Sequence, residues 1–279
     1  MRILVTNDDG IDSIGLHALA RAMVPFGEVV IVAPATEYSG AGAALGTITF
    51  EAPIVRSRTI EGLEDLETWS VDGPPALCTM YAQLGVFGEP FDWVVSGINP
   101  GQNVGWSVYH SGTIGATLTG RNRGASGLAV SLGFDGREVE GQTWEEIVDG
   151  MNWDMGAEVA ATIFEGLIAE NTDEPVVVSA NIPNGTIDRI KGWSEGRVGT
   201  EPPRRAVRGT LVEAGADDEG QIWKLEMDWG SKQQLVEGTD GWLVANKQIS
   251  ITWLGHLTRS EPAPGQLASV GDRLDELLG

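Results

Sequence analysis

Cysteine is almost absent from this chain, with a single residue, Cys78, in 279 positions. One cysteine cannot form an intrachain disulfide, nor can it build a cysteine-based zinc cluster. Any bound metal must therefore be held by oxygen or imidazole ligands.

Long hydrophobic runs are also missing. No apolar stretch approaches the roughly 20 residues that span a bilayer, and the first apolar run, Ile3-Leu4-Val5, is soon interrupted by Asn7. The chain opens with neither a secretory leader nor an anchor pattern. We therefore expect a soluble cytoplasmic protein that is not secreted.

Positive charge is scarce. Forty acidic residues face eighteen basic ones, for a net charge of -22, and only four of the basic residues are lysines. Such a chain repels nucleic acid backbones and anionic membranes, so we expect neither as a partner. Because 42% of the residues are hydrophobic and ten are tryptophan, the chain is expected to fold. The composition favours a protein adapted to a salty cytoplasm, with an ordinary acidic protein as the alternative.

The first thirty residues carry the pattern of a strand, a helix and a second strand. Residues 2–6 and 29–33 are short apolar runs of the β type, and apolar residues recur at helical spacing in residues 13–23. This is a βαβ unit, which implies parallel pairing with a right-handed crossover. The sequence therefore predicts an α/β fold with a Rossmann-like, doubly wound, mostly parallel sheet.

Further segments extend this pattern and then depart from it after Asp188. Strands are expected at residues 93–96, 128–132 and 176–180, and helices at residues 112–121 and 154–170. Beyond Asp188 come short β-like runs, including predicted strands at residues 241–244 and 249–253, and a terminal helix from residue 267. We predict a catalytic core in residues 1–187 and a β-rich extension with a terminal helix in residues 188–279, suited to oligomerisation.

Polar clusters stand where the predicted strands end. Asp8 and Asp9 follow the first strand directly, and adjacent carboxylates are costly without a nearby positive charge. Ligands of open α/β sheets bind beyond the carboxyl ends of the strands. A Mg²⁺ or Mn²⁺ site is the better account of the pair, and a simple Asp-Asp-Gly turn is the alternative.

Two later clusters add neutral donors. Asn99 and Asn103 bracket a Pro-Gly pair, and amides supply ligands or donors without more negative charge. Ser111, Gly112 and Thr113 precede a predicted helix, whose first N–H groups can cradle a phosphate. A glycine-rich turn and a helix N-cap are the corresponding alternatives, and the N-cap is compatible with phosphate binding.

The ordered motifs resemble those of the SurE survival-protein family of 5′-nucleotidases. They are Met-Arg-Ile-Leu-Val-Thr-Asn-Asp-Asp-Gly (1–10), Val-Ala-Pro (32–34), Ser-Gly (39–40), Ser-Gly-Ile-Asn-Pro-Gly-Gln-Asn-Val-Gly (96–105), Ser-Gly-Thr (111–113), Leu-Ala-Val-Ser-Leu (128–132), Asn-Ile-Pro (181–183) and Ile-Lys-Gly (190–192). The resemblance covers most of residues 1–192.

The resemblance implies a metal-dependent phosphatase acting on nucleoside 5′-monophosphates, with 3′-nucleotides or polyphosphate as further substrates, and one Mg²⁺ or Mn²⁺ ion per subunit. It further implies a homodimer or homotetramer with exchanged C-terminal segments. The family's metal ligands fall on Asp8, Asp9, Ser39 and Asn99. Its catalytic polar groups fall on Asn7 and Asn103 as well as on the two aspartates, and its phosphate site on Asn103, Ser111, Gly112 and Thr113.

Some positions depart from the family pattern. Trp106-Ser107 stands where members often carry an acidic pair, and Tyr38 replaces a common basic residue before Ser39. His110, beside the Ser-Gly-Thr motif, could protonate the leaving oxygen, but a plain loop histidine is the favoured interpretation. The alternatives are a metal- or nucleotide-binding protein without turnover, and a Rossmann oxidoreductase that uses the spaced glycines Gly40, Gly42 and Gly46.

Overall fold

A mostly parallel sheet of nine strands forms the centre of the molecule in the computed structural model, which describes residues 1–46, 52–134, 143–170, 172, 174–201, 203–256 and 265–278. The strands in spatial order are β3 (Val55–Ser57), β4 (Glu67–Val71), β2 (Glu28–Pro34), β1 (Arg2–Thr6), β5 (Trp93–Pro100), β6 (Ser126–Gly133), β7 (Val177–Pro183), β11 (Ile249–Trp253) and β8 (Trp193–Glu195). All neighbours from β4 to β7 pair in parallel, whereas β3 and β11 run antiparallel to β4 and β7.

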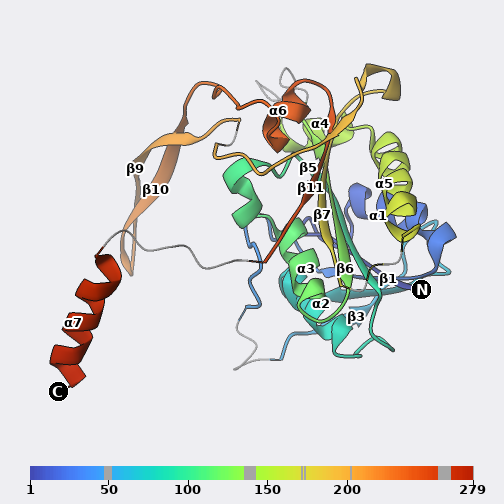
Figure 1. The fold of residues 1–279 in the computed structure, drawn as a ribbon, viewed down its shortest axis with the longest axis horizontal. Coiled ribbons are helices and arrows are strands. Elements are labelled where there is room, and N and C mark those ends of the chain that lie inside the picture. Colours follow the sequence, from blue (N-terminus) through green and yellow to red (C-terminus); the bar gives the residue numbers. More distant parts are fainter. Residues whose placement is uncertain are drawn as a thin grey trace.

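Helices cover both faces of this sheet (Figure 1). The longer ones are α1 (Ile14–Met23) and α5 (Trp153–Ile168) on one face and α2 (Pro75–Gln83) and α3 (Gly112–Arg121) on the other. The shorter ones are α4 (Trp144–Asp149), α6 (Asp240–Ala245) and the 3-10 turns η1 (Val24–Phe26), η2 (Gly105–Tyr109) and η3 (Ile187–Arg189). This is the doubly wound α/β architecture that the sequence predicts.

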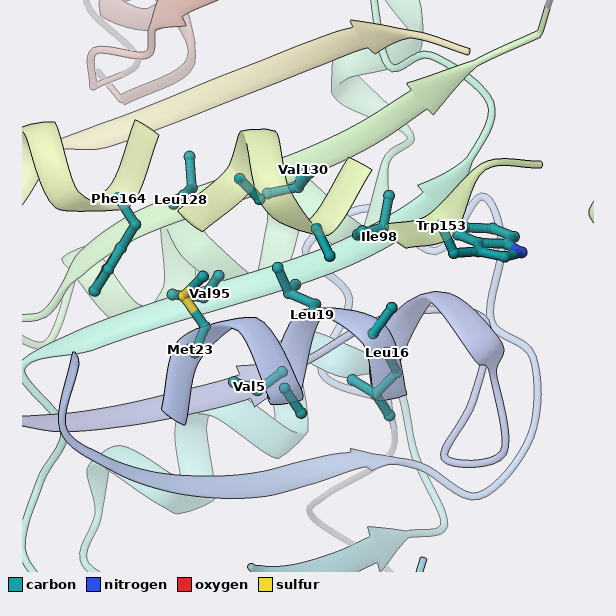
Figure 2. Packing of buried hydrophobic residues seen from close by; sticks show 14 of the residues in the cluster. Val5, Leu16, Leu19, Met23, Val95, Ile98, Leu128, Val130, Trp153 and Phe164 are labelled. Atoms are coloured by element: carbon teal, nitrogen blue, oxygen red, sulfur yellow. The ribbon is translucent and has the colours of Figure 1, made fainter. Parts of the chain in front are cut away.

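The two-residue period of the strands divides the core between the two faces. On β1, Ile3 and Val5 join the cluster under α1 and α5, whereas Leu4 joins the cluster on the opposite face. Figure 2 shows α1 and α5 laid across the sheet, with Leu19 and Phe164 among the side chains between them. Each of these five side chains has no exposed surface. Burial on both faces explains why the strands are continuous apolar runs rather than alternating ones.

The bounds of the predicted core strands and helices agree with the structure within two or three residues, except at the carboxyl-terminal end of β5. The strand expected at residues 93–96 continues to Pro100, so that Asn99 lies on the strand and not in a loop after it. The prediction for residues 241–244 is wrong, because this segment lies in helix α6. Thr239 stands at its N-cap position in extended conformation, and Leu243 and Val244 are buried. A four-residue apolar run cannot by itself distinguish a strand from one turn of buried helix.

The C-terminal part of the chain contributes two strands to the main sheet and also forms elements outside that sheet. Strands β8 and β11, from beyond the predicted boundary at residue 187, pair within the main sheet. Strands β9 (Ala206–Asp217) and β10 (Gly220–Trp229) form a separate antiparallel hairpin that projects from the α/β body (Figure 1). Helix α7 (Gln266–Leu278) also lies away from the α/β body (Figure 1). Among the described residues no helix is long and apolar enough to cross a membrane.

Candidate active site

The strand order reverses direction between β1 and β5. The chain builds outward from β1 to β2 and β4, then returns to place β5 on the other side of β1 and continues to β6 and β7. Such a reversal opens a crevice at the carboxyl ends of the two strands. Asp8 and Asp9 follow β1 at this point, and Asn99 lies near the end of β5. The structure thus places the three residues at the switch point of the sheet.

The carboxylate of Asp8 is buried against the start of helix α3, with 3% of the residue exposed. Thr113 donates its hydroxyl to Asp8 Oδ1 at 2.6 Å. Backbone N–H groups of Gly112 and Thr113 also donate to this carboxylate and oppose the effect of burial, which raises the pKa of Asp8 above its usual range. The first N–H groups of a helix have no partner within the helix and favour a negative charge. Helix α3 therefore holds Asp8 in place.

The carboxylate of Asp9 has fewer hydrogen-bond partners than that of Asp8. Its Oδ2 is buried and accepts no hydrogen bond from the described residues. Burial, followed by the negative charges of Asp8 and Glu37, raises the pKa of Asp9 to about 8. The buried carboxylate of Asp8, the partly buried carboxylate of Asp9 with its unpartnered oxygen, and a third acid nearby form a site that a cation would stabilise. Glu37 had not been singled out in the sequence, where it is one acid in an ordinary loop.

Asn103 lies at the centre of a polar network. Its Nδ2 donates to Ser131 Oγ at 3.0 Å and, at 3.5 Å, to the same Thr113 hydroxyl that binds Asp8. Its backbone is held by the buried amide of Asn181, which accepts from the Asn103 N–H at 2.8 Å and donates to the Asn103 carbonyl at 3.2 Å. Asp8, Thr113 and Asn103 are thus brought together. The sequence reasoning missed Ser131 and Asn181 as site residues, although both fall in motifs that carry the family resemblance.

The start of α3 is capped as the alternative interpretation expects. Ser111 stands at the N-cap and its Oγ accepts from the Ile114 N–H at 3.1 Å. This bond uses an oxygen lone pair and leaves the hydroxyl hydrogen able to donate to a ligand. A Cβ added at Gly115 would lie 2.2 Å from the carbonyl oxygen of Gly42, so the loop after β2 packs directly on this helix.

Ser39, Asn99 and Asn7 form side-chain hydrogen bonds with groups other than the carboxylates of Asp8 and Asp9 in the described part of the chain. The exposed Ser39 donates its hydroxyl to Glu37 at 2.8 Å, and Asn99 donates its amide to the Gly101 carbonyl at 2.6 Å. Asn7 is fully buried, donates to the Gly10 carbonyl at 3.0 Å, and keeps an unpartnered Oδ1. The Tyr38 N–H binds the Asp8 carbonyl at 2.7 Å, which ties the Ser39 loop to the β1 end.

These donors fit a hard divalent cation. The described residues contain no cluster of three or more His, Cys, Asp or Glu side chains placed to hold a metal. A complete shell would therefore combine the two aspartates with neutral oxygens such as those of Ser39 and Asn99, which Mg²⁺ and Mn²⁺ accept. The buried, unpartnered oxygens of Asp9 and Asn7 are the observations that favour such an ion.

The histidines and the cavity add little to this site. His110 is exposed, with its carbonyl accepting the Gly42 N–H at 3.0 Å, and His17 binds the Ile11 carbonyl at 2.8 Å through its ring. A cavity of about 430 Å³ is lined by residues that include Met1, Trp93 and Ser126. Met1 directly precedes β1, and Trp93 and Ser126 begin β5 and β6, so the cavity lies at the opposite end of the sheet from Asp8 and Asp9.

Comparisons with known proteins agree with this arrangement. Residues 3–204 match the family described as "Survival protein SurE". The chain is 33% identical over 276 residues to a protein of Aeromonas hydrophila named 5′-nucleotidase SurE, with 99% of each chain covered. It is 31% identical over 253 residues to a protein of the same name from Clostridium botulinum, covering 90% of this chain and 92% of the relative.

The fold also matches a solved structure. The crystal structure of the SurE protein from Aquifex aeolicus superposes with a TM-score of 0.69 at 28% identity, and each chain is covered completely. The described residues include an antiparallel hairpin beyond the α/β core, as expected for a β-rich extension. The match in sequence over most of the chain, and in fold over all of it, means that this chain belongs to the SurE family.

Proposed function

We propose that this chain is a metal-dependent phosphomonoesterase that hydrolyses nucleoside 5′-monophosphates to nucleoside and phosphate. The observation that carries the proposal is the pair of adjacent carboxylates at the switch point of the sheet: Asp8 is buried and held by the start of α3, and Asp9 has a buried, unpartnered oxygen. The names of the relatives as 5′-nucleotidases support the choice of substrate. The metal ligands in this proposal are Asp8, Asp9, Ser39 and Asn99, with one Mg²⁺ or Mn²⁺ ion per subunit.

In this proposal the two aspartates and their neighbours serve the ion, and neutral donors near the start of α3 serve the phosphate. A bound divalent ion withdraws charge from the phosphate and lowers the pKa of a coordinated water. Asp9 has an oxygen, Oδ2, that accepts no hydrogen bond from the described residues, and this oxygen would be available to accept a proton from an attacking water. Asn7, buried beside the pair, orients the turn that carries both carboxylates through its bond to Gly10.

The phosphate side is formed by neutral donors. The Ser111 hydroxyl donates to none of the residues that the structure describes, and the 3.5 Å contact from Asn103 to Thr113 is long enough to give way to a phosphate oxygen. Gly112 and Thr113 hold Asp8 through their N–H groups and so fix the distance between the carboxylate and this phosphate position. Donors prearranged in this way stabilise the charge that moves to the equatorial oxygens in the transition state.

A decisive test measures phosphate release from AMP, GMP and p-nitrophenyl phosphate with Mn²⁺ or Mg²⁺, and again with a chelator. We expect release that depends on the metal and is abolished by Asp8→Asn, which keeps an oxygen for the Thr113 hydroxyl but loses the charge. Asp12→Asn is the matched control, because Asp12 is exposed four residues along and pairs only with Arg58 at 2.8 Å among the described residues. No metal-dependent release from any monoester would refute the proposal.

We also infer that the chain assembles as a homodimer or homotetramer through its C-terminal part. The projecting hairpin exposes Leu211 (63%), Leu225 (67%) and Met227 (53%), and α7 exposes Leu267 (65%) and Val270 (55%). Apolar side chains gathered on projecting elements are typical of surfaces that another chain covers. Light scattering on the full chain and on a variant lacking residues 265–279 tests this; a full-length monomer would contradict it.

A net charge of -22 repels itself, and salt screens that repulsion. We infer a salt-rich cytoplasm as the place of action, and the salt dependence of stability described in the Discussion tests this inference.

A further inference from the structure

A second buried carboxylate lies outside the site, on the C-terminal part of the chain. Asp240 is 1% exposed and accepts three backbone hydrogen bonds. Its Oδ2 accepts from the Gly105 N–H at 3.0 Å, and its Oδ1 accepts from Gly199 at 3.0 Å and from Gly241 at 2.8 Å. Burying a carboxylate is expensive unless its oxygens are well bonded, so this arrangement has a definite structural purpose.

The three donors belong to segments far apart in sequence. Gly199 precedes the β9–β10 hairpin, Gly241 follows it, and Gly105 begins η2 next to the candidate active site. Packing supports the same connection, because a Cβ added at Gly241 would lie 3.3 Å from Cγ2 of the buried Val104. Asp240 therefore joins Gly199 and Gly241, which lie on the segments leading into and out of the hairpin and are called its base here, to the segment that enters the site.

That segment, residues 103–113, carries most of the proposed phosphate donors. Asn103 is its first residue, and η2 leads from there to Ser111 at the cap of α3. Asn181 fixes the Asn103 end and the Gly42 N–H fixes the His110 carbonyl near the other. The Gly105 N–H is the first of a short helix and has no partner inside it, so Asp240 supplies the bond that anchors the middle.

We infer that Asp240 is a positioning residue for the phosphate site, acting through the Gly105 N–H on residues 103–113. This inference rests on the proposed function. Because the same carboxylate binds Gly199 and Gly241, occupancy of the site is coupled to the base of the hairpin. Coupling between two sites is reciprocal, so a ligand that tightens residues 103–113 also tightens the hairpin base.

The variant Asp240→Asn tests the positioning role. Asparagine has the same size but one oxygen, so at least one N–H group loses its acceptor and faces an NH₂ group. We expect kcat/KM for AMP to fall roughly 10- to 100-fold and inhibition by inorganic phosphate to weaken to a similar extent. The rise in Tm on adding Mn²⁺ should remain, because the proposed metal ligands lie on other segments.

The matched control is Asp217→Asn at the exposed tip of the hairpin. Asp217 Oδ1 also accepts two backbone hydrogen bonds, from Glu219 at 2.9 Å and Gly220 at 3.1 Å. It should leave kcat/KM and phosphate inhibition unchanged. Wild-type phosphate inhibition in Asp240→Asn, or loss of the Mn²⁺ response together with phosphate binding, would overturn the inference, since the second result indicates general unfolding.

Hydrogen exchange on the wild-type protein tests the coupling without any substitution. Inorganic phosphate with Mn²⁺ should slow amide exchange at Gly105 and also at Gly199 and Gly241, with no change at Gly220 in the hairpin tip. Slowing confined to residues 103–113 would overturn the coupling. If the wild-type protein releases no phosphate from nucleotides, the proposed function fails, while phosphate binding and exchange still decide the role of Asp240.

Discussion

The contact between Gly112 and Asp8 leads to a sharp prediction for Gly112→Ala. A Cβ at Gly112 would lie 2.7 Å from Asp8 Cβ and 2.8 Å from Asp8 Oδ2, with Pro75 Cγ at 3.0 Å on another side. Ordinary van der Waals contact for a Cβ begins at 3.4 Å. The added methyl group therefore has no free direction, and either Asp8 or the start of α3 must move by several tenths of an ångström.

Both stability and turnover should respond to this displacement. Inserting a methyl group into a well-packed interior costs about 1–3 kcal/mol, which corresponds to a fall in Tm of about 2–12 °C for a chain of this size. A misplacement of about 1 Å in a catalytic group can cost roughly 100-fold, so kcat/KM for AMP should fall by about that factor. The assays are phosphate release with Mn²⁺ and thermal unfolding.

A second glycine supplies the control. Gly166 is exposed within α5, and nothing lies within 4 Å of a Cβ added there. Gly166→Ala should raise the free energy of unfolding by about 1 kcal/mol through helix propensity and leave turnover unchanged. If Gly112→Ala keeps kcat/KM within about threefold of wild type, Asp8 does not serve the reaction from the position described.

Three further predictions concern the same network and the charge of the chain. Thr113→Val removes the donor to Asp8 and should lower the free energy of unfolding by about 1.5–3 kcal/mol in chelator and also reduce kcat/KM, as measured by denaturant titration and phosphate release; an unchanged denaturation midpoint would contradict this. Asn181→Ala leaves the Asn103 N–H without its acceptor and should lower kcat/KM roughly 5- to 100-fold while the Mn²⁺-induced rise in Tm persists; loss of that rise would instead indicate a wider collapse. Raising KCl from about 0.1 M to about 1 M shortens the screening length from about 10 Å to about 3 Å and should raise Tm well beyond a sucrose control of equal osmolality; a flat or falling Tm would argue against adaptation to salt.

Much of the fold could be predicted because the core strands are buried on both faces. The continuous apolar runs at β1, β2, β6 and β7 follow from that burial and stand out in the sequence. Residues 241–244 misled for the same reason. Leu243 and Val244 are buried, but they lie in one short helix, and burial alone does not reveal the period of an element.

Some residues of the candidate site could be predicted from local motifs, and others could not. Asp8, Asn103 and Thr113 could be named because each stands in a motif at a strand end or a helix start. Asn181 and Asp240 could not be placed by local reasoning, since each acts on a backbone group about 78 or 135 positions away in the chain. Their roles depend on which segments the sheet brings together, and no local pattern encodes that.

The placement of β11 between β7 and β8 has a consequence for synthesis of the protein. Strand β8 leaves the ribosome first, but it has no place in the sheet until β11, about fifty residues later, has paired with β7. During that interval the edge of β7 presents unpaired backbone groups, which can template pairing with another nascent chain. A pause in synthesis between the two strands therefore prolongs the time for which the β7 edge is open to pairing with another chain.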